Sequence, residues 1–398
     1  MKINMIKNSI VKRTNIAAVL ISVGLTSLLT ACGGGGGSDG GTVAPTTPTT
    51  PTTPTSTIDE QFGFWLTDLS DNHILPSYQS LQDKAQALNK ETTDFCAQAS
   101  QNISELEQVQ NSWRELSLSW QTIQWLKVGP VLDDNRIFRL HFFPDNDAKV
   151  ASFISDKLHS NEEINEAFIA KQPVFGQGLP AMEQLLFSDG NQTSLLTADD
   201  KAKRCELLQA ISANVATISA EVNNGWQVNQ GNYQSQLTQG SGDFSGKKDA
   251  VEELVTNWLE QIERVKDEKM LIPLALEAPG IPSIVEQLYS GESLNSIKAN
   301  IDTFRVIYTA GNGRGFDDVL NDFLDQKNIN TEMLAAIDAA IVASKALDRE
   351  YETLLKTEDG RAKITATIDS LRLVRDLLTA DFVQATDINI GFNSNDGD

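Results

Sequence analysis

The sequence predicts an all-α protein made of two antiparallel helical bundles. Three observations support this fold class. Apolar residues recur at intervals of three and four over long stretches, alternating strand-like runs are scarce, and a polar, Gly-rich stretch at 227–246 interrupts the helical pattern. We therefore expect an N-terminal helical bundle at 58–230 and a C-terminal helical bundle at 240–398, preceded by a leader and a tether.

Residues 1–31 are predicted to be a lipoprotein signal peptide. A basic leader precedes an apolar run at 16–29, which is too short for a convincing membrane-spanning helix. The run ends in LTAC, which resembles a bacterial lipobox whose Cys32 receives the lipid; the alternative is an uncleaved anchor. Gly33 stands where an inner-membrane retention signal has Asp. We therefore expect an outer-membrane lipoprotein with its body in the periplasm or on the cell surface.

Residues 32–57 are predicted to form a Gly/Thr/Pro-rich tether. Its glycine run is typical of a flexible coil, and prolines at every third position from 45 to 54 match the turn of polyproline II. The segment has nothing apolar with which to build a core. At ~3.3 Å per residue, about 25 residues reach at most about 80 Å, which holds the body away from the membrane.

The helices of the body follow from apolar stripes. The clearest stripe runs from 103 to 123 and carries Trp113 and Trp120, with Gly129–Pro130 as its stop signal. Aromatic residues in such stripes are expected in the core rather than at a cofactor. Further helices are expected at 251–262, at 364–378, and near 76–98, 196–222, 295–309 and 332–356.

The chain carries a formal net charge of −22, and loss of the four basic residues of the leader lowers it to about −26. So acidic a body is a poor partner for nucleic acid or for an anionic membrane surface. We therefore expect membrane attachment through the lipid anchor and no nucleic-acid partner.

Two cysteines, Cys96 and Cys205, remain after the lipidated one. In an exported chain an even pair is most simply a disulfide, although two buried free thiols are the alternative. A bridge would close a loop of about a hundred residues, for which chain entropy gives roughly 4–5 kcal/mol of stabilisation.

Several enzyme classes lack their motifs in this sequence. The three histidines include no H-E-x-x-H pair, and there is no G-x-S-x-G elbow, P-loop or dinucleotide fingerprint. His159 and Glu162 form H-x-x-E, but polar sequence follows them, so we expect a solvated surface. The closing NSNDGD offers oxygen ligands to calcium, although such termini are more often solvated.

Three segments break the helical pattern with Gly, Pro and polar residues, and helical scaffolds usually keep their sites in such segments. They are 136–147, 277–294 and 388–398.

A further stretch, GQGLPAMEQLLF, carries Gly178, Pro180 and Glu183 in the spacing G-x-P-x-x-E. With Pro180 as the first helical residue, Glu183 lies in the first turn, where the helix dipole stabilises an exposed negative charge by ~0.3–1 kcal/mol. A functional role requires Glu183 to face polar groups from distant segments, such as Arg139 or Asp145.

Together these features resemble the imelysin-like family, which includes the insulin-cleaving membrane proteases. The matching features, in chain order, are the W…W…GP helix of 113–130, RLHFFPDND at 139–147, GLPAMEQLLF at 178–187, the cysteine of KRC at 203–205, SGESLNSIKANI at 290–301 and GFNSNDGD at 391–398. The resemblance implies two related helical bundles with a functional site between them, an outer-membrane or periplasmic setting, and a link to iron uptake.

The family motif G-x-H-x-x-E maps onto Gly178, Pro180 and Glu183, so proline replaces the imidazole. Proline offers no lone pair to a metal. Oxygen-only coordination by Glu183 with other acids would suit a hard cation such as ferric iron, so iron or another divalent or trivalent cation is the expected ligand or cofactor. The candidate ligand-binding residues are Gly178, Pro180, Glu183, Arg139, Asp145, Glu286 and Ser293.

We therefore predict a non-catalytic, lipid-anchored binding protein that acts in the uptake of iron or another ligand. A metallopeptidase with Glu183 as its family-motif residue is the first alternative, because the family resemblance implies one. A scaffold that docks a peptide or an outer-membrane transport partner between the bundles is the second.

Overall fold

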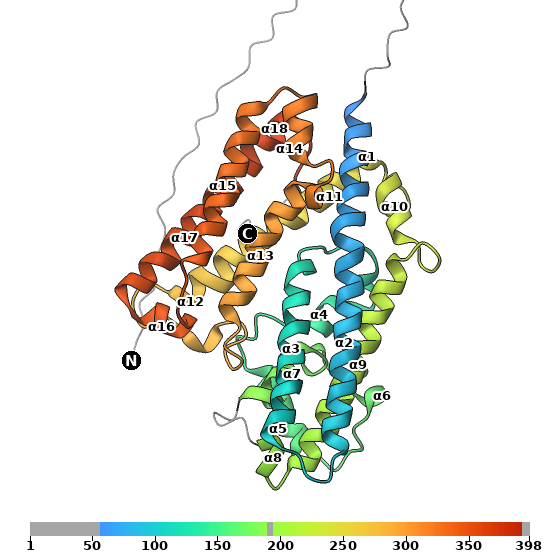
Figure 1. Ribbon diagram of the computed structural model, residues 1–398, viewed down its shortest axis with the longest axis vertical. Helices are drawn as coiled ribbons and strands as arrows, with labels where there is room; N and C mark the ends of the chain where they lie inside the picture. Colours follow the sequence, from blue (N-terminus) through green and yellow to red (C-terminus); the bar gives the residue numbers. More distant parts are fainter. Residues whose placement is uncertain (1–55, 189–193, 392–398) are drawn as a thin grey trace, which may run out of the picture. The chain divides into compact units, whose positions relative to one another are not determined.

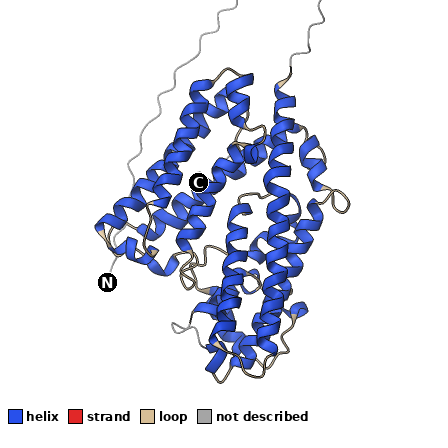
Figure 2. Ribbon diagram, in the orientation of Figure 1, coloured by secondary structure: helices blue, strands red, loops and turns tan. Residues whose placement is uncertain are grey.

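The computed structural model describes residues 56–188 and 194–391, which belong to one compact unit. The described part consists of helices and their connections without any strand, so the predicted all-α class is confirmed (Figure 2). The predicted signal peptide, Cys32, the tether up to residue 55 and the NSNDGD tail lie outside the described residues.

The α-helices of the described part are α1 (Ile58–Leu69), α2 (Leu75–Ala97), α3 (Ile103–Ile123), α4 (Arg136–Leu140), α5 (Lys149–Leu158), α6 (Glu166–Ile169), α7 (Leu179–Phe187), α8 (Ser194–Thr197), α9 (Lys201–Trp226), α10 (Tyr233–Gln239), α11 (Lys247–Glu263), α12 (Ile272–Leu274), α13 (Ser293–Tyr308), α14 (Phe316–Asp318), α15 (Lys327–Lys345), α16 (Tyr351–Lys356), α17 (Glu358–Leu377) and α18 (Val383–Thr386). Four π-helical segments interrupt or extend them: η1 (Ser70–Ile74), η5 (Arg264–Leu271), η8 (Val319–Phe323) and η9 (Leu378–Phe382).

Most of the predicted helices are confirmed, and their boundaries have local causes. The stripe at 103–123 is α3, which begins with a capping box formed by Asn102 and Glu105. The helix predicted near 332–356 is wrong in one respect, because the chain breaks it into α15 and α16. Leu347 is fully buried in that break. The polar stretch at 227–246 also contains a helix, α10.

Helices α1 and α2 follow one another through η1 as a single long rod (Figure 1). Helix α2 packs against α3 and α9, whereas α1 packs against α10 and α11. The indole nitrogen of Trp65 in α1 also donates to the carbonyl of Ile307 in α13, at 3.0 Å. The first helix therefore joins elements from both halves of the sequence, and the division into 58–230 and 240–398 stays a prediction.

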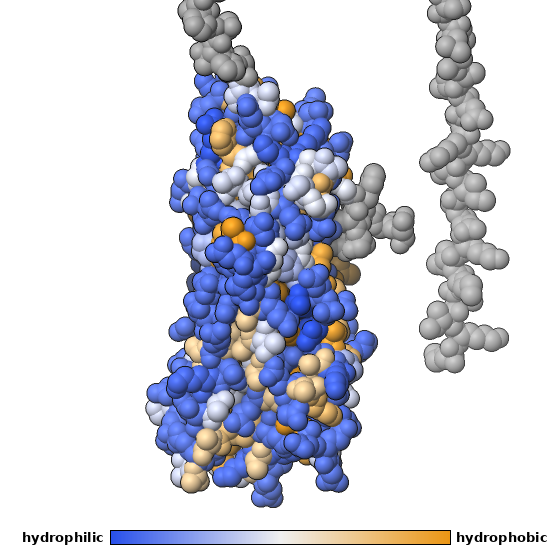
Figure 3. Space-filling view, turned by 90° about the vertical axis from the view of Figure 1, so that its right-hand side faces the viewer, coloured by the Kyte–Doolittle hydropathy of each residue, from blue (hydrophilic) through white to orange (hydrophobic). Residues whose placement is uncertain are grey.

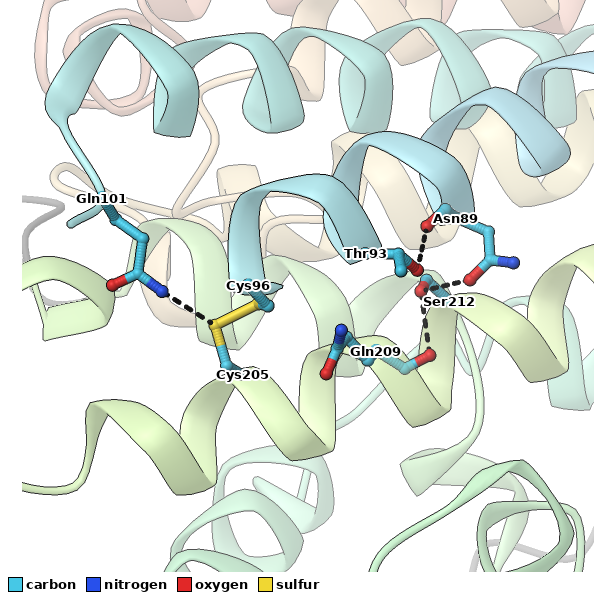
Figure 4. Close-up of a disulfide and its surroundings, with 7 residues drawn as sticks. All are labelled: Asn89, Thr93, Cys96, Gln101, Cys205, Gln209 and Ser212. Atoms are coloured by element: carbon cyan, nitrogen blue, oxygen red, sulfur yellow. Dashed lines mark hydrogen bonds between the residues drawn. A yellow bond between two sulfur atoms is a disulfide. The ribbon is translucent and has the colours of Figure 1, made fainter. Parts of the chain in front are cut away.

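The disulfide predicted from the cysteine count is present. Cys96 at the end of α2 is bonded to Cys205 in α9, with 5.6 Å between the Cα atoms (Figure 4). The same pair of helices is also joined by the hydroxyl of Ser212, which donates to the side chain of Asn89 at 3.0 Å. These bonds hold α2 and α9 together near the C-terminal end of α2.

On the face drawn in Figure 3 hydrophilic residues predominate and hydrophobic ones are scattered. Within the described part, none of the helices has the length and apolar character needed to cross a membrane.

Candidate functional site

A cavity of about 130 Å³ lies where three separate stretches of the chain meet. One wall comes from the segment between α4 and α5 and the first turn of α5, at 141–151. A second comes from the start of α7, at 179–184. The third is the irregular segment 283–289, which precedes α13. Trp113 of α3 also lines the cavity. Two of the segments singled out in the sequence for breaking the helical pattern thus meet at one place.

Gly178 sets the approach of α7 to the first wall. A Cβ at this position would lie 2.2 Å from the carbonyl oxygens of both Arg139 and Leu140, so only glycine fits without displacing the backbone. The helix starts at Leu179, and Pro180 occupies its second position, where a missing N–H costs nothing. The prediction that Glu183 belongs to the first turn is therefore wrong: it lies one residue beyond that turn.

Glu183 is buried and points its carboxylate at the third wall. Its Oε1 atom accepts hydrogen bonds from the backbone N–H of Ser290 at 2.9 Å and from the Ser290 hydroxyl at 2.7 Å. Burial raises the pKa of Glu183 from 4.5 to about 7. The Ser290 hydrogen bonds oppose that rise, and the charge of Glu286 adds to it. This carboxyl group therefore changes its charge close to neutral pH.

Glu286, on the third wall, is held by a buried polar network. Its Oε2 atom lies 2.9 Å from the ammonium of Lys269 in η5, and its Oε1 atom lies 3.4 Å from Nε2 of His141. Burial alone would raise the pKa of Glu286, but Lys269 and His141 outweigh burial and lower it. Glu286 is consequently an ionised, paired carboxylate.

The other members of this network are satisfied by one another. The ammonium of Lys269 donates to the side-chain oxygens of Gln121 at 2.8 Å and Asn300 at 2.7 Å. Burial lowers the pKa of Lys269, with Glu286 opposing that change. Burial likewise lowers the pKa of His141 to about 4, so the imidazole is neutral at pH 7.

Asp145 lines the cavity, but its carboxylate is hydrogen-bonded to backbone N–H groups. Its two oxygens accept from the N–H groups of Lys149 at 2.8 Å and Val150 at 2.9 Å, at the start of α5. This arrangement satisfies N–H groups that a helix start leaves free and orients the segment before it. The guanidinium of Arg264 in η5 holds the same segment by donating to the carbonyl of Phe143 at 2.9 Å.

The third wall is held to its neighbours by hydrogen bonds at Glu286, at Gln287 and at Ser290, which follows it. Gln287 has a left-handed backbone with φ of 53°, and its side chain is hydrogen-bonded to Ser117 of α3 and Ser296 of α13. The hydroxyl of Ser293 donates to the carbonyl of Glu286. Gln287 and the Ser290–Glu183 contact therefore tie an irregular segment to two helices that come much earlier in the chain.

The comparison with protein families decides the assignment. The family model described as imelysin, a peptidase family by name, matches residues 74–378. The chain belongs to the imelysin family.

Two solved structures have the same fold. An imelysin-like protein from Psychrobacter arcticum 273-4 is 18% identical, with a TM-score of 0.69 over 84% of this chain and 98% of its own. A candidate iron-regulated protein A precursor from Parabacteroides distasonis ATCC 8503 is also 18% identical, with a TM-score of 0.64 over 81% of this chain and 96% of its own. Among curated proteins none matches the chain.

Of the candidate residues chosen from the sequence, the cavity brings together four: Pro180, Glu183, Asp145 and Glu286. Gly178 stands just before the cavity. The side chain of Arg139 is not part of the lining; it donates to Gln177 at 2.7 Å and Asn214 at 3.3 Å. Ser293 is not part of the lining either; its hydroxyl donates to the carbonyl of Glu286 on the third wall.

Three residues of the buried network beside the cavity are absent from the candidates chosen from the sequence: His141, Lys269 and Gln121. His141 lies in the segment 136–147 that the sequence did single out, so its proximity to Arg139 and Asp145 was the available signal. Lys269 belongs to the charged run RVKDEKML and looks like a surface residue, and nothing in the sequence marks its burial.

The pattern H-x-x-E of His159 and Glu162 makes no site. His159 is exposed, and its Nδ1 atom contacts the carbonyl of Ser155 at 2.7 Å, while Glu162 pairs with Lys157 at 3.0 Å. Across the two described stretches, no group of three or more His, Cys, Asp and Glu side chains is placed to hold a metal ion.

Proposed function

We propose that this imelysin-family protein is a non-catalytic binding protein that holds a small ligand in the cavity between 141–151, 179–184 and 283–289. The observation that carries the proposal is the meeting of three irregular walls around a cavity lined by Glu183 and Glu286. Enclosed, partly apolar cavities with a few converging polar groups are the usual form of small-ligand sites.

The state of the acidic side chains favours binding over metal-assisted hydrolysis. Pro180 stands on the cavity wall where the family motif has histidine, and it cannot ligate a metal. The carboxylates are already engaged: Glu286 by Lys269, Asp145 by backbone N–H groups and Glu183 by Ser290. A metal ion would therefore enter this cavity most readily as a chelate that brings ligands of its own.

We further propose a role in iron uptake at the outer membrane. The support is the name of one structural neighbour, a candidate iron-regulated protein A precursor, together with the lipobox ending in Cys32. In this role the lipid anchors the chain, the segment 32–57 spaces the body from the membrane, and a transport partner receives the ligand.

Titration calorimetry of the purified full-length chain in mild detergent tests the proposal, with ferric chelates and haem as probes. The matched variant is Ala151→Phe, which fills the cavity without changing any charge; Ala335→Phe on the exposed face of α15 is its control. We expect saturable binding that Ala151→Phe abolishes and Ala335→Phe leaves intact. Binding indifferent to Ala151→Phe, or no binding of any probe, refutes the proposal.

Peptidase activity is the second candidate, and Glu183 is the observation that favours it. A buried carboxyl group with a pKa of about 7 in a cavity is typical of a general base. Cleavage of an unfolded protein such as casein, abolished both by a chelator and by Glu183→Ala, would establish this reaction and remove the non-catalytic assignment.

A further inference from the structure

The charged groups around the cavity are distributed unequally. Three carboxylates line it, those of Asp145, Glu183 and Glu286, while the lining contains neither lysine nor arginine. The one histidine of the lining, His141, is neutral at pH 7, because burial lowers its pKa to about 4. The cavity therefore presents negative charge and hydrogen-bond acceptors to whatever enters it.

The three carboxylates differ in how much of their charge is already matched. Glu286 has a cationic partner, the buried Lys269, at 2.9 Å, and Lys269 is not part of the cavity lining. Asp145 and Glu183 accept hydrogen bonds from neutral donors: backbone N–H groups in one case, and Ser290 with the backbone of Tyr289 in the other. Ionised Glu183 is thus a buried anion without a neighbouring cation of its own, which is a costly state that a cationic ligand would relieve.

Aromatic side chains from the first and third walls and from α3 also line the cavity. Trp113, Phe142, Phe143 and Tyr289 all contribute to the lining. The indole nitrogen of Trp113 donates to the carbonyl of Leu179 at 3.1 Å, which fixes this ring beside the start of α7. Carboxylates combined with aromatic rings are the usual surroundings of organic cations, since both attract positive charge and the rings also contact an apolar frame.

We infer that the ligand of this cavity is a small organic cation, an amine or guanidinium on an apolar frame, with its charged group at Glu183. This inference rests on the proposed binding function and names its ligand class. A compact metal ion fits less well, because the carboxylates are spread over separate walls and the described residues contain no group placed to hold a metal.

The inference predicts how binding depends on pH. Glu183 must be ionised to hold a cation, so affinity rises as the pH increases through about 7 and stays high while an alkylammonium keeps its charge, below about pH 9. The groups around Glu183 are Glu286, whose charge raises the Glu183 pKa, and Asp145, His141 and Tyr289 of the same lining. Burial keeps His141 neutral across this range, and Lys269 keeps Glu286 ionised, so the change belongs to Glu183.

Ligand-observed NMR titration of the full-length chain tests the inference with benzylamine as probe. Benzyl alcohol and benzoate are the matched controls, because they keep the ring and replace the cation by a neutral or a negative group. At pH 8 we expect saturable benzylamine binding, at least tenfold weaker binding of benzyl alcohol and none of benzoate. Between pH 6 and pH 8 the benzylamine affinity should rise by roughly tenfold.

Two variants distinguish the contribution of the Glu183 charge to binding from that of the cavity's shape. Glu183→Gln keeps the size of the side chain and an acceptor for Ser290, and it should weaken benzylamine about tenfold or more while removing the dependence on pH. Ala151→Phe should abolish binding of every probe. Benzylamine binding unaffected by Glu183→Gln, or equal affinity for benzyl alcohol, overturns the inference. Ferric chelates that bind in an Ala151-dependent way while benzylamine does not would overturn it too, and would leave the proposed binding function standing.

Discussion

Replacement of Glu183 by glutamine should make the protein more stable at high pH, because the native fold penalises the ionised carboxylate. The pKa of this group is about 7 in the folded state against 4.5 for an exposed glutamate. A folded-state pKa above the unfolded one means that the native protein binds the proton more tightly. Stability from this group is therefore greatest below pH 4.5, falls as the pH rises to about 7, and is constant above that.

The size of the effect follows from the two pKa values. Their difference of about 2.5 corresponds to about 3 kcal/mol over the full range of pH. Between pH 5.5 and pH 8.5 the free energy of unfolding of Glu183→Gln should gain about 2 kcal/mol relative to the wild type, since part of the change occurs below pH 5.5. Glutamine does not titrate and still offers an oxygen to Ser290, so the hydrogen bond does not confound the comparison.

Urea unfolding followed by tryptophan fluorescence, at half-unit steps of pH, measures this difference. Urea is preferred to guanidinium because it leaves charge interactions unscreened. The control is Glu107→Gln at an exposed position of α3, which removes the same charge without a buried environment. If the free energy of unfolding of Glu183→Gln does not change relative to the wild type, or falls, as the pH rises, the claim that burial raises the pKa of Glu183 is refuted.

Three further predictions concern the supports of the site and are read by the same urea unfolding. Gly178→Ala should lower the free energy of unfolding by at least about 2 kcal/mol, because the new Cβ would lie 2.2 Å from two carbonyl oxygens. The control, Gly246→Ala, should lower it by only about a few tenths of a kcal/mol, because nothing lies within 4 Å of the new Cβ. Similar losses for the two variants would contradict the close approach at Gly178. Lys269→Met should lower the free energy of unfolding by about 3–5 kcal/mol, because it leaves Glu286 buried without its cation. Adding Glu286→Gln to this variant should recover part of that free energy. Strictly additive losses of stability in the double variant would contradict the pairing. Replacing both cysteines of the α2–α9 disulfide by serine should lower the free energy of unfolding by about 4 kcal/mol, and an unchanged value would contradict the contribution of this bridge.

The fold was largely predictable because local patterns in the sequence indicate where its helices form. Apolar residues at three- and four-residue spacing give α3, α11 and α17, and an even cysteine pair in a chain predicted to be exported gives the disulfide. The break between α15 and α16 was not visible, because buried Leu347 continues the apolar pattern while the backbone leaves the helix. Periodicity reports which residues are buried and says less about where the backbone turns.

The site was predictable only in part, since its members are assembled by contacts between distant segments. Glu183 and Glu286 could be chosen because they lie in irregular or Gly-rich sequence. Lys269 could not, because its burial depends on Gln121, which precedes it by 148 residues, and on Glu286. Arg139 drew attention through its charge, yet its side chain bonds to Gln177 and Asn214 outside the cavity lining.

The same limit applies to Pro180. From the sequence it is a lost metal ligand and a good residue for a helix start, and the structure places it both in the second position of α7 and on the cavity wall. Only the surroundings of Pro180 indicate the kind of ligand that we infer for the site: three carboxylates, aromatic rings and a neutral histidine line the cavity.

A crystal structure of the full-length chain grown with benzylamine at pH 8 would show whether an organic cation binds at Glu183. We expect density for the probe between the three walls, with its nitrogen within about 3.2 Å of a carboxylate oxygen of Glu183 and its ring against the aromatic lining. An empty cavity in a crystal that binds the probe elsewhere, or a probe whose nitrogen points away from Glu183, would contradict it.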